Sequence, residues 1–191
     1  MSLILKQAPD FIAEAIVDGK LTKDFSLEQY IDQKYVVLFF YPKDFSAICP
    51  SEMWAFQDAI EEFEKRDAVV VGCSTDTDAA HKVWLKTPRN QGGIEGTTYP
   101  LIADNSKVIS TNYGVLGGNY DYDDEGFLRF EGSPIALRGT FIINKKGVVM
   151  YEAKNFFTIA RDIDAILREL DAIKNFEENG EVCLANWKSK K

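Results

Sequence analysis

Two short apolar runs separated by one amphipathic helix constrain the fold of this 191-residue chain more than any other feature. Residues 35–41 (YVVLFFY) and 68–74 (AVVVGCS) are uninterrupted and rich in β-branched and aromatic side chains. Runs of this kind are typical of strands that are buried on both faces. Between them, residues 50–65 place apolar side chains on one face of a helix. The order of strand, helix and strand predicts a sheet that is covered by helices.

The remaining pattern extends this sheet. We expect a strand or hairpin at 11–17, a turn at 26–30 capped by Ser26, and further strands at 99–103, 135–143 and 148–153. We expect helices at 77–86 and 106–113. A last helix is expected to begin at Thr158, with Ile159 and Ile163 in its buried stripe. Residues 144–147 (NKKG) signal a hairpin between two of these strands. The sequence therefore predicts an α/β protein with a mixed sheet flanked by helices, which is the thioredoxin-like arrangement. We expect one domain over residues 1–176 and a C-terminal arm over residues 177–191.

Composition excludes several functions. The net charge is −8, and the acidic residues are spread along the chain, which argues against a nucleic-acid or anionic membrane surface. No stretch approaches the roughly 20 apolar residues of a membrane span. Residues 1–10 lack the pattern of a signal peptide, so we expect a cytoplasmic protein.

The three cysteines stand at positions 49, 73 and 183 without a CxxC pair, so the spacing indicates neither a zinc site nor a local redox pair. In a reducing compartment such cysteines are more often catalytic or inert than structural. His81 is the only histidine, and any Cys–His chemistry would have to rest on it. No flavin or nicotinamide motif is present, and we expect neither a cofactor nor a metal.

Cys49 is the strongest candidate for a reactive group. It precedes Pro50, a residue suited to the first turn of a helix. A thiol at a helix start faces free N–H groups and the positive end of the dipole, and both favour the thiolate. The alternative is that Cys49 is a small buried hydrophobic residue, as most free cysteines are. Its position alone does not decide between the two.

Arg138 is the second candidate, because it interrupts the apolar run at residues 135–143. A charge there is unfavourable unless it is paired or functional. Arg138 therefore either serves a site or reaches solvent from the edge of the strand. A reactive cysteine without a nearby histidine needs a cation of this kind to ionise.

The motifs around Cys49 resemble a known family. Pro42, Ser46 and Cys49 match the peroxiredoxin signature Pro-xxx-Thr/Ser-xx-Cys, with serine in place of the commoner threonine. The segment with Cys183 and Trp187 is similar to the resolving-cysteine segment of the typical two-cysteine, alkyl hydroperoxide reductase-like branch. Further matches lie at residues 71–76, 84–89, 100–104 and 137–143, so the resemblance runs from about Gln7 to Trp187.

This resemblance implies a role for each matching residue. Cys49 would be the peroxidatic nucleophile, Ser46 and Arg138 would hold the peroxide oxygens, and Pro42 would shield the sulfur. Donors that are already in position stabilise the charge that develops on the leaving oxygen. The forked guanidinium of arginine holds two oxygens better than lysine does.

Glu52 and Arg161 occupy positions that brace the active-site arginine in the family.

The resemblance also implies how the oxidised cysteine is resolved. Cys183 of a partner subunit would capture the Cys49 sulfenic acid as an intersubunit disulfide. The resemblance implies a peroxidase that reduces hydrogen peroxide and alkyl hydroperoxides, assembles as a homodimer and further as a decamer, and is re-reduced by a thioredoxin-like protein or a flavoprotein. An oligomeric holdase chaperone or a peroxide sensor on the same fold is the alternative. A dithiol oxidoreductase is disfavoured because no CxxC pair is present.

Several residues carry other expectations. Cys73 is expected in the core, His81 at the surface or in a local hydrogen bond, and Trp187 as an anchor for the arm. Residues 92–95 read Gly-Gly-Ile-Glu where sensitive family members have Gly-Gly-Leu-Gly, and the chain ends four residues after Trp187, so we expect resistance to overoxidation. Residues 117–133 are acidic and longer than usual for the family; a solvated loop is the default expectation, and a modified oligomer contact is the sharper one.

Overall fold

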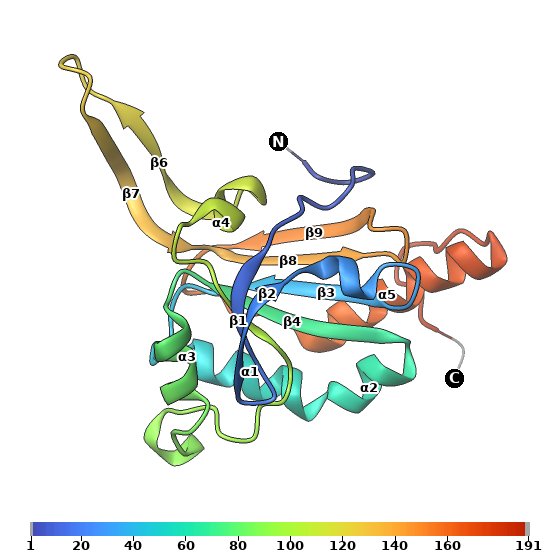
Figure 1. Ribbon diagram of the computed structural model, residues 1–191. Coiled ribbons are helices and arrows are strands. Elements are labelled where there is room, and N and C mark those ends of the chain that lie inside the picture. The colour runs from blue at the N-terminus through green and yellow to red at the C-terminus, as the bar shows by residue number, and fades with distance from the viewer. Residues whose placement is uncertain (1, 190–191) are drawn as a thin grey trace.

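A seven-stranded mixed sheet forms the centre of the molecule, with helices against both faces (Figure 1). The computed structural model describes residues 2–189. The strand order is β2-β1-β5-β4-β3-β8-β9, and β6 and β7 form a separate two-stranded sheet. The strands are β1 (Ala13–Val17), β2 (Lys20–Phe25), β3 (Tyr35–Phe40), β4 (Ala68–Ser74), β5 (Leu101–Ala103), β6 (Leu116–Tyr122), β7 (Leu128–Ala136), β8 (Arg138–Ile143) and β9 (Val149–Asn155). The helices are η1 (Leu27–Tyr30), α1 (Cys49–Asp58), α2 (Ile60–Lys65), α3 (Asp78–Trp84), η2 (Arg89–Gln91), α4 (Val108–Asn112) and α5 (Ile163–Asn179). The thioredoxin-like architecture that the sequence predicts is confirmed.

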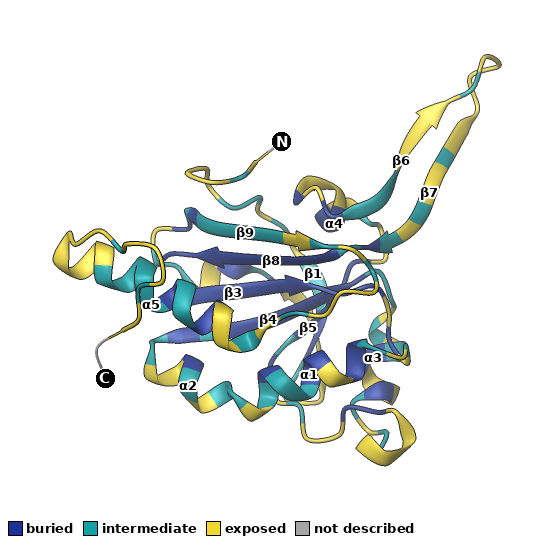
Figure 2. Ribbon diagram, turned by 180° about the vertical axis from the view of Figure 1, so that it is seen from behind, coloured by how far each residue is buried: buried dark blue, intermediate teal, exposed yellow. Residues whose placement is uncertain are grey.

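β3 lies in the middle of the sheet, parallel to β4 and antiparallel to β8. Its six residues are all buried, and β3 and β8 are dark along their length in Figure 2. Alternate side chains enter two different cores, Val37 and Phe39 on one side and Leu38 and Phe40 on the other. Burial on both sides explains why this strand is apolar without interruption.

The crossover from β3 to β4 differs from the expected single helix over residues 50–65. It consists of α1 and α2, and Ala59 interrupts the helix between them with φ −97° and ψ 6°. The expected apolar face is still formed, because Met53, Phe56 and Phe63 are all fully buried. Within residues 2–189, none of the helices has the length and apolar character needed to cross a membrane.

The prediction that Thr158 begins the last helix is wrong. Asp162 is the N-cap, and its side chain accepts a hydrogen bond from the N–H of Ala165 at 3.1 Å. Ile159, which the sequence places in the buried stripe, is 58% exposed. The reason is that Arg161 points back into the sheet, where its guanidinium donates to the carbonyl of Phe40, so the helix begins only after it.

The C-terminal end of α5 lies beyond residue 176, where the sequence predicts the start of the arm. The helix runs to Asn179 and is closed by Gly180, which adopts a left-handed conformation with φ 70°. The first three residues of the expected arm are therefore helical, and Cys183 lies beyond the cap.

The default expectation of a solvated loop at residues 117–133 is also wrong, because β6 and β7 form a long hairpin there that projects from the body (Figure 1). The Asp123 side chain accepts hydrogen bonds from the N–H groups of Glu125 and Phe127 at 3.2 and 2.7 Å. Gly126 supplies the left-handed residue of the turn with φ 84°. These local contacts close the turn and set the register of the two strands.

The position of the α5 cap can be tested with a matched pair of variants. Asp162→Ala should lower the free energy of unfolding by about 1 kcal/mol, because it removes the acceptor of an otherwise unpaired helix N–H. Thr158→Ala should change it by less than about 0.5 kcal/mol, as is usual for a surface substitution. Urea unfolding followed by far-ultraviolet circular dichroism measures both, and a larger effect of Thr158→Ala would place the cap at residue 158.

Candidate active site

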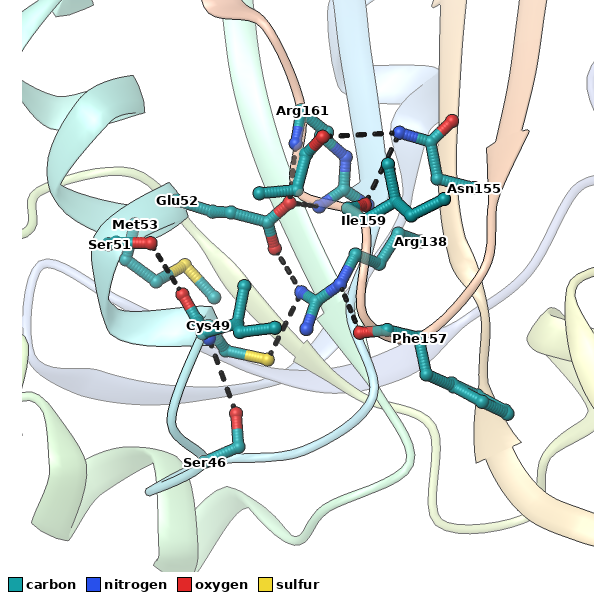
Figure 3. Close-up of polar contacts among 12 residues, drawn as sticks. Ser46, Cys49, Ser51, Glu52, Met53, Arg138, Asn155, Phe157, Ile159 and Arg161 are labelled. Atoms are coloured by element: carbon teal, nitrogen blue, oxygen red, sulfur yellow. Dashed lines mark hydrogen bonds and ion pairs between the residues drawn. The ribbon is translucent and has the colours of Figure 1, made fainter.

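The loop from β3 to α1 places Cys49 at the first turn of α1, with Pro50 next to it. The backbone N–H of Cys49 donates to the Ser46 hydroxyl at 3.3 Å, so Ser46 fixes the start of the helix (Figure 3). The Cys49 side chain is completely buried. The thiol therefore points inward, toward groups that other elements supply.

Arg138 is the group that meets Cys49. It begins β8, and its Nη1 lies 3.4 Å from the Cys49 sulfur in hydrogen-bonding geometry. Its Nε donates to the Phe157 carbonyl at 2.8 Å, which holds the guanidinium plane in place. Arg138 is only 3% exposed, so the alternative that it reaches solvent from a strand edge is wrong.

Glu52 and Arg161 complete a buried ionic cluster behind Arg138 (Figure 3). One Glu52 oxygen pairs with Arg138, and the other lies 2.9 Å from Nη1 of Arg161. Arg161 also donates from Nε to the Thr140 hydroxyl at 2.9 Å. Burial lowers the pKa of Arg161, and the Glu52 carboxylate opposes this shift.

The charges in this cluster do not cancel. Two guanidinium groups and one carboxylate are buried together, which leaves one positive charge beside the Cys49 sulfur. An uncompensated buried charge is strongly unfavourable, and a thiolate at Cys49 would neutralise it. This arrangement can hold an anionic sulfur and then donate hydrogen bonds to an oxygen that approaches it.

An open pocket of about 210 Å³ lies in front of these groups. It is lined by Pro42, Lys43, Ser46, Ala47, Ile48, Ile135, Arg138 and Phe157. Pro42, Ser46 and Arg138 are therefore brought together as the sequence predicts, and Cys49 lies directly behind the last two. Ile135 and Phe157 were not identified from the sequence, since apolar residues in a strand and a loop carry no distinguishing signal.

Cys183 lies elsewhere in the protomer. Its Sγ contacts the Ala172 carbonyl at 3.7 Å and the Asn175 amide at 3.8 Å, both on α5. Cys183 and Cys49 are both free thiols. The structure therefore does not bring the two cysteines together within one chain.

Of the two expectations for His81, the surface position is wrong because the side chain is fully buried, and the hydrogen-bonded role is the one that the structure contains. Its Nδ1 lies 2.8 Å from an Asp44 oxygen, and its Nε2 lies 3.1 Å from the Ile102 carbonyl. Tyr41 donates to the other Asp44 oxygen at 2.9 Å. Since Asp44 belongs to the loop before Cys49, this network fixes the loop from behind.

The network shifts the pKa values of both of its titrating groups, His81 and Asp44. Burial alone would lower the pKa of His81, but the hydrogen bond and charge of Asp44 raise it above its ordinary value. Burial raises the pKa of Asp44, and His81 opposes part of that shift. Sequence spacing gave no signal for this pair, whose members are 37 residues apart.

The other candidates have structural roles. Cys73 is buried in the core as expected, and burial raises the pKa of its thiol well above the ordinary value. Trp84 and Trp54 donate to the carbonyls of Gly92 and Gly93 at 2.9 and 3.1 Å, and so anchor that loop. No group of three or more histidine, cysteine or acidic side chains suited to a metal ion occurs among residues 2–189.

Comparison with known proteins places this site in context. The model of the AhpC/TSA family matches residues 4–152. A thioredoxin peroxidase from Echinococcus granulosus is 43% identical over 186 residues, which cover 97% of this chain and 89% of the relative. Peroxiredoxin-2 from Mus musculus is 45% identical over 183 residues, covering 96% of this chain and 85% of the relative. The structure of reduced 2-Cys peroxiredoxin from Plasmodium vivax superposes with a TM-score of 0.88 at 37% identity, covering 100% of this chain and 92% of that one.

The His81 pair predicts a pH-dependent stability. A group whose folded pKa is raised stabilises the fold fully below its unfolded value, near 6.5 for histidine, and this contribution is lost as the pH rises through the folded value. The free energy of unfolding should therefore fall as the pH rises from about 6.5. Chemical unfolding across pH 6 to 8 measures the slope, and His81→Gln should flatten it. Because the chain has no other histidine, an identical slope in the variant would assign the dependence to other groups.

Proposed function

Because the chain belongs to the AhpC/TSA family and is a typical two-cysteine peroxiredoxin, we propose that Cys49 is the nucleophile of its thiol-dependent peroxidase activity. The observation that carries this proposal is the excess positive charge of the buried cluster beside the Cys49 sulfur. Arg138 Nη1 lies 3.4 Å from that sulfur. The names of the relatives are those of peroxidases, so the holdase and sensor alternatives are not favoured.

The first step is a displacement at oxygen. The Cys49 thiolate attacks one oxygen of a hydroperoxide, an S–O bond forms and the O–O bond breaks. Cys49 is oxidised to the sulfenic acid, and the leaving oxygen takes up a proton and departs as water or an alcohol. Hydrogen peroxide and alkyl hydroperoxides both fit this scheme, since the open pocket in front of Arg138 leaves room for a substituent.

Each neighbour of Cys49 has a part in this step. Arg138 and the Ser46 hydroxyl contact the peroxide oxygens and stabilise the negative charge on the leaving one. Pro42 limits the access of water to the sulfur from the pocket side. Glu52 and Arg161 act through Arg138, because they hold its guanidinium at the sulfur.

The second step needs another protomer. The thiolate of the partner's Cys183 attacks the Cys49 sulfenic sulfur, and an intersubunit disulfide forms as the S–O bond breaks. The leaving hydroxide takes up a proton and becomes water. This assignment is supported by the separate placement of the two thiols, since Cys183 contacts α5 of its own chain. A homodimer, assembling further into a decamer, supplies the second copy. The disulfide then takes two electrons from the dithiol of a thioredoxin-like protein or from a flavoprotein.

The cytoplasm is the location we propose. The proposed cycle returns Cys49 and Cys183 to free thiols, which is favoured in a compartment that keeps thiols reduced. No cofactor is needed for either chemical step.

Arg138→Lys tests the contribution of the guanidinium. A lysine keeps the charge but loses the fork that reaches the sulfur, Glu52 and the Phe157 carbonyl together. The rate of Cys49 oxidation by peroxide should fall by about 100-fold, as for removal of a donor that stabilises a developing oxyanion. Stopped-flow tryptophan fluorescence measures this rate, and Arg66→Lys on a partly exposed ion pair should stay within about twofold of the original protein.

Single substitutions distinguish the roles of the two cysteines. Cys49→Ser should abolish peroxide consumption with dithiothreitol as reductant, because a serine hydroxyl is not oxidised by peroxide and so cannot supply the two electrons that break the O–O bond. Cys183→Ser should still form a Cys49 sulfenic acid, trapped by dimedone and detected by mass spectrometry, but should give no disulfide-linked dimer on non-reducing gels. Persistent turnover in the first variant would remove Cys49 as nucleophile, and a dimer in the second would exclude Cys183 as its partner.

A further inference from the structure

The β6–β7 hairpin has an apolar face that no other part of residues 2–189 covers. The register pairs Tyr120 with Phe130 and Tyr122 with Leu128, so all four side chains lie on one face of the ribbon. The rings of Tyr120 and Phe130 meet edge to face with centroids 4.9 Å apart. Tyr122 is 70% exposed and Leu128 is 57% exposed. A two-stranded ribbon is marginally stable by itself, and a contiguous exposed apolar face indicates an interaction site.

The charge of the hairpin restricts what can cover this face. The five carboxylates of residues 116–136 are Asp121, Asp123, Asp124, Glu125 and Glu131. Against them stands one cation, Arg129, which pairs with Asp123 at 2.8 Å. Asp124 and Glu125 are exposed at the tip. The complementary occupant is a segment that is apolar in one part and basic in another.

The C-terminal arm of this chain has that character. Val182 and Leu184 are 74% and 75% exposed, although both are apolar. After Cys183 the arm contains Trp187 and three lysines but no carboxylate side chain. Lys188 is exposed, and Lys190 and Lys191 lie outside the described residues. The arm therefore matches the hairpin in both apolar character and sign of charge.

A protomer's own arm is not placed to occupy its own hairpin. The hairpin projects from one end of the molecule, while the arm lies against α5 at the opposite end in both views (Figures 1 and 2). The occupant is accordingly the arm of a second copy.

The base of the hairpin adjoins the pocket in front of Arg138, which the partner's arm must reach to form the disulfide. Ile135 of β7 lines the pocket in front of Arg138. At Gly117 of β6, a Cβ atom would lie 2.7 Å from the ring of Phe157, another wall of the same pocket. Gly118, the next residue, faces the ring of Phe130 instead, so the apolar face lies on the other side of the ribbon from the pocket and meets it around the edge of the hairpin base.

The lengths are compatible with this path. Residues 184–191 span at most roughly 26 Å when fully extended. The nine residues of β7 span about 30 Å from the pocket toward the tip. With Cys183 at the pocket, the backbone of Lys188 would lie no further than about 18 Å along the hairpin. Asp124 and Glu125 at the tip therefore attract the lysines across solvent and not through direct ion pairs.

We propose that the apolar face of the β6–β7 hairpin is the docking surface for residues 184–191 of a second copy, and that this docking holds the partner's Cys183 beside the hairpin base, next to the pocket of Cys49. The inference rests on the proposed function, in which these two residues form the intersubunit disulfide. The hairpin tip attracts the lysines and the aromatic face holds Leu184 and Trp187. Because exposed charges are screened by salt, this guidance weakens as ionic strength rises.

Charge reversal on each side tests the docking. Reduced protein is mixed with hydrogen peroxide in a rapid-quench instrument, Cys49 sulfenic acid is measured by dimedone labelling, and the disulfide-linked dimer is measured on non-reducing gels. Asp124→Lys/Glu125→Lys and Lys188→Glu/Lys190→Glu should each slow dimer formation at least fivefold at low salt, with sulfenic acid formation unchanged. The combined variant should return to within twofold of the original rate, because the attraction is restored with its signs exchanged.

Control variants separate the effect of docking from the effect of a change in net charge. Glu61→Lys/Glu64→Lys changes the net charge equally, at exposed positions of α2, and should leave dimer formation unchanged. Asp124→Asn/Glu125→Gln removes the tip charges without reversing them and should slow dimer formation at least twofold. An unchanged rate in the reversed variants, or no recovery in the combined one, overturns the docking. Failure of Cys49 itself to form the sulfenic acid would instead overturn the proposed function, and the inference with it.

Discussion

The buried contact of Arg138 with Glu52 and Arg161 is the interaction on which the arrangement of this molecule depends. It joins α1, β8 and the segment before α5, and through the Phe40 carbonyl it also reaches β3. Breaking a buried pair by removing one partner typically costs about 3–5 kcal/mol, because a charge is left alone in the interior. Glu52 is the only carboxylate that pairs with either arginine in the described residues, so it serves both. The cluster is consequently a constraint on four elements at once.

Local irregularities of the fold follow from that constraint. Arg161 must turn into the sheet, and so α5 begins late, at Asp162, and Ile159 remains in solvent. Arg138 must stand where β8 begins, since only there can its Nε reach the Phe157 carbonyl while its Nη1 reaches the sulfur. In most proteins an arginine inside an apolar strand would be unfavourable, and here the Glu52 carboxylate and the Phe157 carbonyl compensate it.

The sequence predicts those features that a short-range pattern of residues controls. The apolar run of β3, the NKKG turn before β9 and the helix start at Cys49 each carry a local signal, and the structure contains all three. The burial of His81 could not be predicted, because its partner Asp44 lies on another element and no spacing rule connects them. The hairpin was missed for a different reason: its strands are rich in glycine and acidic residues, which are typical of loops, and its turn is held by the Asp123 side chain. For the site, the motif identified Pro42, Ser46 and Arg138, whereas Ile135 and Phe157 emerge only from packing.

The two thiols of the proposed cycle stand in contrasting environments, and this contrast indicates which segment moves most easily. Cys49 is fully buried beside a cluster that ties four elements together. Cys183 is held by sulfur contacts of 3.7 and 3.8 Å to α5, and its neighbours Val182 and Leu184 remain in solvent. Releasing the arm therefore gives up weak sulfur and amide contacts to α5 and the partial burial of Trp187, whereas exposing Cys49 disturbs a packed core. Segments that travel during function are drawn from the least stable parts of a fold, and the arm beyond Gly180 meets that description.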